Sequence, residues 1–389
     1  MTAEMVEAKG LEIFEVGPCE DAYRMGFLIG QRFSNQIKSR LANDLILQNQ
    51  LLPFAQTPEA QQLLQSLTEN NRNKFPRYWE ELIGTAEGSG VPVLQIILIN
   101  FRKEILAFLP KMVINQGIDT PDDCSDVLVA SESMAVVAHN EDANVALVGH
   151  AGLPSCAFGL NSHGLCLKSN DRSKTKLYAE KAFTLNSVPP SESEIVAGGI
   201  GRNFISRDLL EAASIDDALC RIKSSEVSIG HSYNLIETRT RKISNVETAS
   251  RNRVSVYEVG ATPFFRANMY LHLQVDQVHD ENSKTRQSKA AVLPKRSKED
   301  FLSLLGDTDD PKYPIYMIGD LEHRLNFLFV PSKTFVVTLF AVFPGPLLYT
   351  LCTAVIDLDE KTLSIVEGNP RKGEISHIFS LCSKDFKMP

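Results

Sequence analysis

One cysteine lies where cleavage of the chain would expose a nucleophile. Cys124 follows Asp123 in the segment DDCSDVLV, in which acidic residues surround it. Negative neighbours disfavour a thiolate, so a cysteine in this setting is usually inert. The segment, however, separates a helical pattern from a strand-rich one. Cleavage between Asp123 and Cys124 would place an α-amino group, with a pKa of about 8, on the residue that carries the thiol, so one residue would supply both base and nucleophile.

Helical periodicity dominates the residues before this junction. Apolar side chains recur there at spacings of three and four, which is typical of amphipathic helices. The expected helices cover residues 20–50, 58–72, 74–87 and 92–109, and the third is expected to end at Gly88. Gly26 and Gly30 lie four residues apart on the first helix, so they share a face and favour close packing against another helix.

Short strands dominate after the junction. Valine-rich segments between residues 127 and 137 fit strands better than a helix. A helix is expected over residues 203–223 with a break near Ser214, and a hairpin is expected to turn at Asp359–Lys361. Helices followed by many strands with flanking helices predict an α+β layered fold.

Composition narrows the class of function. The chain has 389 residues, of which 43% are hydrophobic, and its net charge is −8, which does not favour a nucleic-acid partner. The N-terminal segment shows no secretory signal, and seven scattered cysteines form no CxxC pair, so free thiols and a cytoplasmic location are expected. The uncharged run from Thr334 to Ile356 is interrupted by Pro344, Gly345 and Pro346, so no membrane span is expected.

Motifs spread over most of the chain resemble one family. They include GPCEDAYRMGFLIGQRFSNQI, DDCSDVLV, AHNEDA, FGLNSHGL, HSYNLIE and FFRANMYLH. Together they resemble the acyl-coenzyme A:6-aminopenicillanic-acid acyltransferases and their group of cysteine N-terminal-nucleophile hydrolases, which includes insect N-β-alanyl-dopamine hydrolases. The resemblance implies a four-layer αββα sandwich. It also implies a zymogen that cuts itself into residues 1–123 and 124–389, which stay associated.

The same resemblance implies the chemistry and its residues. Cys124 matches the nucleophile, which would attack an N-acyl amine or an acyl-CoA thioester and form a thioester acyl-enzyme, with no cofactor. Asp142 matches an acidic residue that would orient the new amine or assist cleavage. Asn234 matches the asparagine that would stabilise the oxyanion. Arg286 matches an arginine near the acyl pocket, and the alternative is a surface charge. Glu247 matches a family glutamate, and the alternative is a surface position on a strand.

Some features depart from the family pattern. Asp123 stands where the family usually has glycine, which relieves crowding at the cleaved bond. Residues 166–181 and 318–345 have no family counterpart, and a strand pair near residue 150 is missing. These departures indicate an alternative transcript or gene model. The phenylalanine-rich segment 318–345 is expected to be poorly packed, or else to cover a sheet edge left by the missing strands.

The sequence leaves three alternatives open. Metal-dependent hydrolysis would use His139, Glu141, Asp142 and His150, but these fit no zinc spacing and strand alternation would split them between faces, so no metal site is expected. An ordinary cysteine hydrolase would use Cys156 or Cys166 with His163. A catalytically inactive isoform would keep part of the fold and be inert or bind a partner.

Overall fold

The computed structural model describes most of the two halves predicted from the sequence. The described residues are 12–13, 16, 19, 21–110, 124–144, 158–161, 176–177, 181–278, 280–318, 327–328 and 348–381. Asp123, His150, Cys156, His163 and Cys166 lie outside them. So do nearly all residues of the two predicted inserts, whose packing therefore stays a prediction.

The N-terminal half is helical, as predicted. Its helices are α1 (Ala22–Arg32), α2 (Ser34–Asn43), α3 (Leu52–Ala55), α4 (Pro58–Lys74), α5 (Pro76–Ser89), α6 (Val93–Asn100) and α7 (Arg102–Leu106), with a π-helical turn at Leu47–Leu51. The expected first helix is divided at Phe33, and the last at Phe101. The predicted end of α5 at Gly88 is wrong by two residues, because Gly90 forms the C-cap with φ of 70°.

Glycines bring α1 and α5 into close contact. A Cβ atom added at Gly26 would lie 2.0 Å from the backbone oxygen of Glu81, and one added at Gly84 would lie 2.1 Å from that of Tyr23. Gly30 and Gly88 are equally crowded by the backbone of the opposite helix. The predicted close packing of α1 is therefore confirmed, with glycines on both helices.

Two sheets form the C-terminal half. One has the order β4 (Phe158–Asn161), β6 (Lys181–Asn186), β7 (Ser232–Glu237), β8 (Lys242–Ala249) and β9 (Arg253–Glu258). The other has the order β10 (Phe264–Arg266), β2 (Cys124–Ala130), β3 (Ala135–Asn144), β12 (Leu348–Asp357), β13 (Thr362–Glu367), β14 (Glu374–Leu381) and β5 (Lys176–Leu177). All pairings in both sheets are antiparallel except that of β14 with β5. Apart from these, β1 (Glu12–Ile13) pairs in parallel with β11 (Phe327–Leu328).

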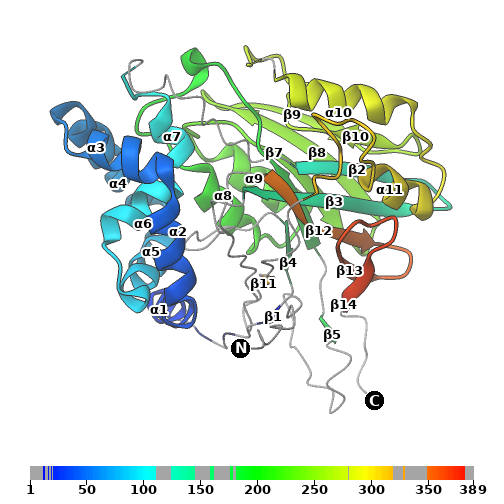
Figure 1. Cartoon of the computed structure of the whole chain (residues 1–389), viewed down its shortest axis with the longest axis horizontal. Coiled ribbons are helices and arrows are strands. Elements are labelled where there is room, and N and C mark those ends of the chain that lie inside the picture. Colours follow the sequence, from blue (N-terminus) through cyan, green and yellow to red (C-terminus); the bar gives the residue numbers. More distant parts are fainter. Residues whose placement is uncertain are drawn as a thin grey trace, which may run out of the picture.

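Helices cover the outer face of each sheet. Helices α8 (Arg202–Leu209) and α9 (Ile215–Lys223) lie on the five-stranded sheet, and Ser214 caps α9 at the predicted break. Helices α10 (Glu281–Val292) and α11 (Lys298–Leu305) lie on the seven-stranded sheet, in yellow in Figure 1, while the blue and cyan helices α1–α7 gather at the opposite side of the molecule. The predicted αββα sandwich is confirmed.

An aromatic cluster joins the N-terminal helices to α8. Phe204 of α8 packs against four aromatic rings of the N-terminal half, namely Phe75, Tyr78 and Trp79 at the start of α5, and Phe101 between α6 and α7. Beside it, Arg207 Nε lies 3.1 Å from the buried carboxylate of Glu81. We call these contacts the α5–α8 interface. It fixes the helical half on the outer layer of the sandwich.

The two faces of β2 are buried in different cores. Leu128 and its neighbour Val137 on β3 belong to the core between the sheets. Val127 and Val129 belong to a second core that includes Phe301 of α11. Because side chains alternate along a strand, Cys124 shares the face of Leu128 and points between the two sheets. Within the described part of the chain, no helix is both long and apolar enough to cross a membrane.

Replacing Gly84 with alanine should destabilise the protein by about 1–3 kcal/mol, because the added methyl group collides with backbone that cannot move without separating α1 from α5. Urea unfolding would measure the loss. Gly260→Ala is the matched control, since a Cβ atom there meets nothing within 4 Å. Equal stability of the two variants would contradict the close contact.

Candidate active site

Cys124 is the first residue of β2 and faces a carboxylate on the next strand. The antiparallel register pairs Cys124 with Glu141 of β3. Directly opposed residues point to the same face, and the Cys124 Sγ lies 3.5 Å from Glu141 Oε2. Both side chains are buried. A thiol and a proton acceptor therefore lie together in the space between the sheets.

A buried histidine connects this carboxylate to a second one. His139 Nε2 lies 3.1 Å from Glu141 Oε2, and its Nδ1 lies 2.9 Å from Asp126 Oδ1. Burial by itself would lower the pKa of His139, but the carboxylates of Asp126 and Glu141 outweigh it and raise that pKa to about 10. At neutral pH the imidazolium therefore donates to both carboxylates, and the thiol lies at the end of an ordered chain of polar groups.

The backbone of Cys124 is held by two side chains from outside its own strand pair. Asn268 Oδ1 accepts a hydrogen bond from Cys124 N at 2.9 Å. Arg286 Nη1 donates to Cys124 O at 2.8 Å, and its Nη2 donates to Asn268 Oδ1 at 2.9 Å. Arg286 lies on α10 and has no exposed surface, so the alternative of a surface charge is wrong. It contacts the nucleophile's backbone, and its predicted contact with an acyl group stays a prediction.

Asn234 is connected to the site by hydrogen bonds through Thr184 and Asp126. Its Nδ2 donates to Thr184 Oγ1 at 2.8 Å, and Thr184 Oγ1 donates to Asp126 Oδ1 at 2.8 Å. Its Oδ1 accepts from Asn245 at 2.6 Å. Asn234 is therefore part of the same buried network, on the sheet opposite Cys124. Its role as an oxyanion donor stays a prediction.

Asp142 lies on the other face of β3 from Cys124. It is paired with Thr350 of β12, whose Oγ1 donates to Asp142 Oδ1 at 2.6 Å. Alternation gives Asp142 the same face as Asn140, whose Nδ2 donates to the Leu305 carbonyl of α11 at 2.8 Å. The catalytic role inferred for Asp142 stays a prediction, but Glu141 is the carboxylate placed at the thiol.

Glu247 has a buried structural setting, not the surface position that was its alternative. Its side chain has no exposed area. Its carboxylate accepts from the backbone nitrogens of Leu271 and Leu273, both at 2.7 Å, and from Arg266 Nη1 at 3.2 Å. It therefore fixes the segment that follows Asn268.

Sequence reasoning missed several residues that the fold brings to the site. Asn268 lies in FFRANMYLH, a motif that carried the resemblance, but its side chain was not singled out. Asn186 follows Thr184 by two residues on β6 and so shares its face. Asn186 is fully buried, and neither its Oδ1 nor its Nδ2 has a hydrogen-bond partner in the described structure. Such an amide is suited to a polar group of a ligand.

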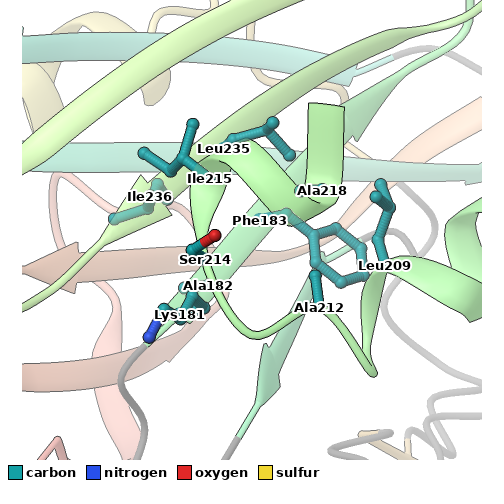
Figure 2. A pocket seen from close by; sticks show the side chains of 10 residues that line it. All are labelled: Lys181, Ala182, Phe183, Leu209, Ala212, Ser214, Ile215, Ala218, Leu235 and Ile236. Carbon is teal, nitrogen blue, oxygen red and sulfur yellow. The ribbon is translucent and has the colours of Figure 1, made fainter. Parts of the chain in front are cut away.

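Two cavities lie elsewhere in the described structure. Figure 2 shows one of about 10 Å³, where Leu209 and Ile215 of the α8–α9 segment meet Phe183 and Leu235. Another, of about 440 Å³, is lined by residues of α3 and α4 and by Gly198. Cys124 lines neither of them, so neither is assigned to the acyl group.

Comparisons with known proteins identify a family and a distant relative. The profile of the family described as acyl-coenzyme A:6-aminopenicillanic acid acyl-transferase matches residues 125–329, which is more than half of the chain. The beta-alanyl-dopamine/carcinine hydrolase of Drosophila melanogaster is 23% identical over 383 residues, covering 90% of this chain and 92% of that protein. The matched region begins one residue after Cys124 and includes Asn234, Asn268 and Arg286.

Glu141→Gln should slow the self-cleavage predicted from the sequence by about 100-fold or more, because it removes the proton acceptor 3.5 Å from the thiol. Asp142→Asn is the matched variant from the opposite face and should have a much smaller effect. A time course after cell-free synthesis would follow the appearance of the chain that begins at Cys124. A larger effect of Asp142→Asn would support the role inferred for Asp142 from the sequence.

Proposed function

The chain belongs to the acyl-coenzyme A:6-aminopenicillanic acid acyl-transferase family, and on that premise we propose that it is a self-cleaving cysteine amidohydrolase or acyltransferase. The observation that carries this proposal is the position of Cys124. It is the first residue of a buried strand, its thiol lies beside a carboxylate, and its backbone nitrogen is held by Asn268. A nucleophile and a prospective terminal amine thus share one fixed residue.

Maturation would begin with the thiol of the uncut chain. Cys124 Sγ attacks the carbonyl carbon of Asp123 while Glu141 accepts the thiol proton. The bond from that carbon to Cys124 N then breaks, the nitrogen gains a proton, and a thioester forms. Water hydrolyses the thioester, which leaves a carboxylate on Asp123 and a free amine and thiol on Cys124. Residues 1–123 and 124–389 become two chains that stay associated.

Turnover would use the new amine as the base. Asn268 Oδ1 is placed to accept a hydrogen bond from it. The amine removes the thiol proton as Sγ attacks the substrate carbonyl, and the same proton then passes to the leaving amine or thiol. The product is a thioester acyl-enzyme, from which water or an acceptor amine takes the acyl group.

The substrate class is an N-acyl amine or an acyl thioester. The relative's name specifies beta-alanyl-dopamine and carcinine, so N-β-alanyl amines are the first compounds to test on this chain, alongside acyl-CoA thioesters. Asn234 is proposed as the oxyanion donor. Asn186 is the alternative oxyanion donor, because its amide is buried and lacks a hydrogen-bond partner among the described residues.

The purified protein should separate into two chains, one ending at Asp123 and one beginning at Cys124, as measured by intact mass and N-terminal sequencing. Cys124→Ala should remain a single chain, because no other residue supplies a thiol at this junction. Cys220→Ser is the control, since Cys220 is exposed on α9 and should not affect cleavage. A wild-type chain that stays whole at neutral pH would rule out self-cleavage.

Asn234→Ala should permit cleavage and lower turnover of the cleaved enzyme by about 100-fold or more, the usual effect of losing one oxyanion donor. The rate of acyl transfer or hydrolysis on the N-acyl amine panel provides the measurement. Asn186→Ala serves as the comparison. Full activity of a processed Asn234→Ala variant, with the loss found in Asn186→Ala, would transfer the role to Asn186.

A further inference from the structure

Three side chains at the start of β2 and along β3 form a cluster of metal-ligating atoms. The thiol of Cys124, the imidazole of His139 and the carboxylate of Glu141 each offer one ligand atom, and these atoms all lie within 4.8 Å of one another. All three residues are buried. Spacing along β3 alone does not reveal this cluster, because the register brings its third member from β2.

The spacing of the ligand atoms suits Zn²⁺. Zinc binds sulfur at about 2.3 Å and nitrogen or oxygen at about 2.0–2.2 Å, so tetrahedral ligands are separated by about 3.4–3.6 Å. The Cys124 Sγ lies 3.5 Å from Glu141 Oε2, and His139 Nε2 lies 3.1 Å from the same oxygen. These two separations are within a few tenths of an ångström of the tetrahedral values, and the thiol and the imidazole lie within 4.8 Å of each other.

Asp126 supplies the orientation that a zinc-binding histidine needs. A ligating histidine usually donates its second ring N–H to a carboxylate, which fixes the tautomer. Here His139 Nδ1 lies 2.9 Å from Asp126 Oδ1, and that oxygen also accepts from Thr184 at 2.8 Å. Nε2 is thus the ring nitrogen that faces the carboxylate of Glu141. Asp126 and Thr184 therefore hold the histidine in the orientation that binding of zinc requires.

We propose that Cys124, His139 and Glu141 bind a Zn²⁺ ion, and that this ion, bound to the nucleophilic sulfur, reversibly inhibits the protein. Zinc on the sulfur withdraws electron density from it, which lowers its nucleophilicity, and holds it away from a substrate carbonyl. The inhibition rests on the function proposed above, whereas the binding of zinc does not.

The binding test is a zinc titration of the purified full-length protein in competition with a chromophoric chelator. One ion per protein is expected. Co²⁺ in place of Zn²⁺ should give a thiolate-to-metal charge-transfer band in the near ultraviolet, which reports the sulfur ligand directly. Asp126→Asn should weaken zinc binding by about 10–100-fold, and His139→Gln by more than that.

Two control variants test the assignment to this cluster. Cys220→Ser removes an exposed thiol. Cys352→Ser removes a buried thiol on β12, the strand that pairs with β3 on the side away from β2, where Cys352 is opposite Glu141. Both should keep the affinity and the cobalt band. Unchanged affinity in folded His139→Gln and Glu141→Gln variants would overturn the site, as would loss of the ion in Cys220→Ser.

The inhibition test separates this inference from the proposed function. Zinc at saturating concentration should stop turnover, and a chelator should restore it. A protein that cleaves itself and turns over substrate but binds no zinc would overturn the inference alone. A protein that binds zinc at the cluster, yet stays uncut and inactive after the metal is removed, would overturn the proposed function and the inhibitory role together, while the zinc site would stand.

Discussion

The register of β2 against β3 decides which side chains can reach the nucleophile. Seven consecutive residue pairs, from Cys124 with Glu141 to Ala130 with Ala135, fix it. A slip of one residue would turn every side chain of one strand to the opposite face. Here that would expel His139 and Glu141 from the space between the sheets and place Asn140 and Asp142 there. Because both faces of β2 are buried in apolar cores, such a slip is strongly opposed.

Arg286 connects this strand pair to the outer helical layer. A buried guanidinium is costly unless its donors are satisfied. Arg286 has five N–H groups, and among the described residues it donates to Cys124 O and to the side chains of Ser125, Asn268, Asn282 and Ser283. A lysine has no comparable fork, so the position of α10 and that of the Cys124 backbone depend on arginine in particular.

Local patterns in the sequence were sufficient to predict the helices and strands, but not the contacts between them. Apolar periodicity predicted the helices on both sides of the junction, and the alternation of valines predicted β2 and β3. Choosing between Glu141 and Asp142 required the face of β3 that meets the second sheet, which depends on the packing of whole layers. Asn268 and Arg286 reach Cys124 from 144 and 162 residues away, and no local signal encodes such distances.

The α5–α8 interface takes on a different physical role if the chain is cut. In the intact chain, the covalent link keeps the two sides of that interface at a high effective concentration. After cleavage the aromatic rings around Phe204 and the Glu81–Arg207 ion pair must supply the affinity between two separate molecules. The N-terminal segment would then behave as a tightly bound subunit and not as a discarded propeptide. Mutations in the interface would make activity depend on dilution.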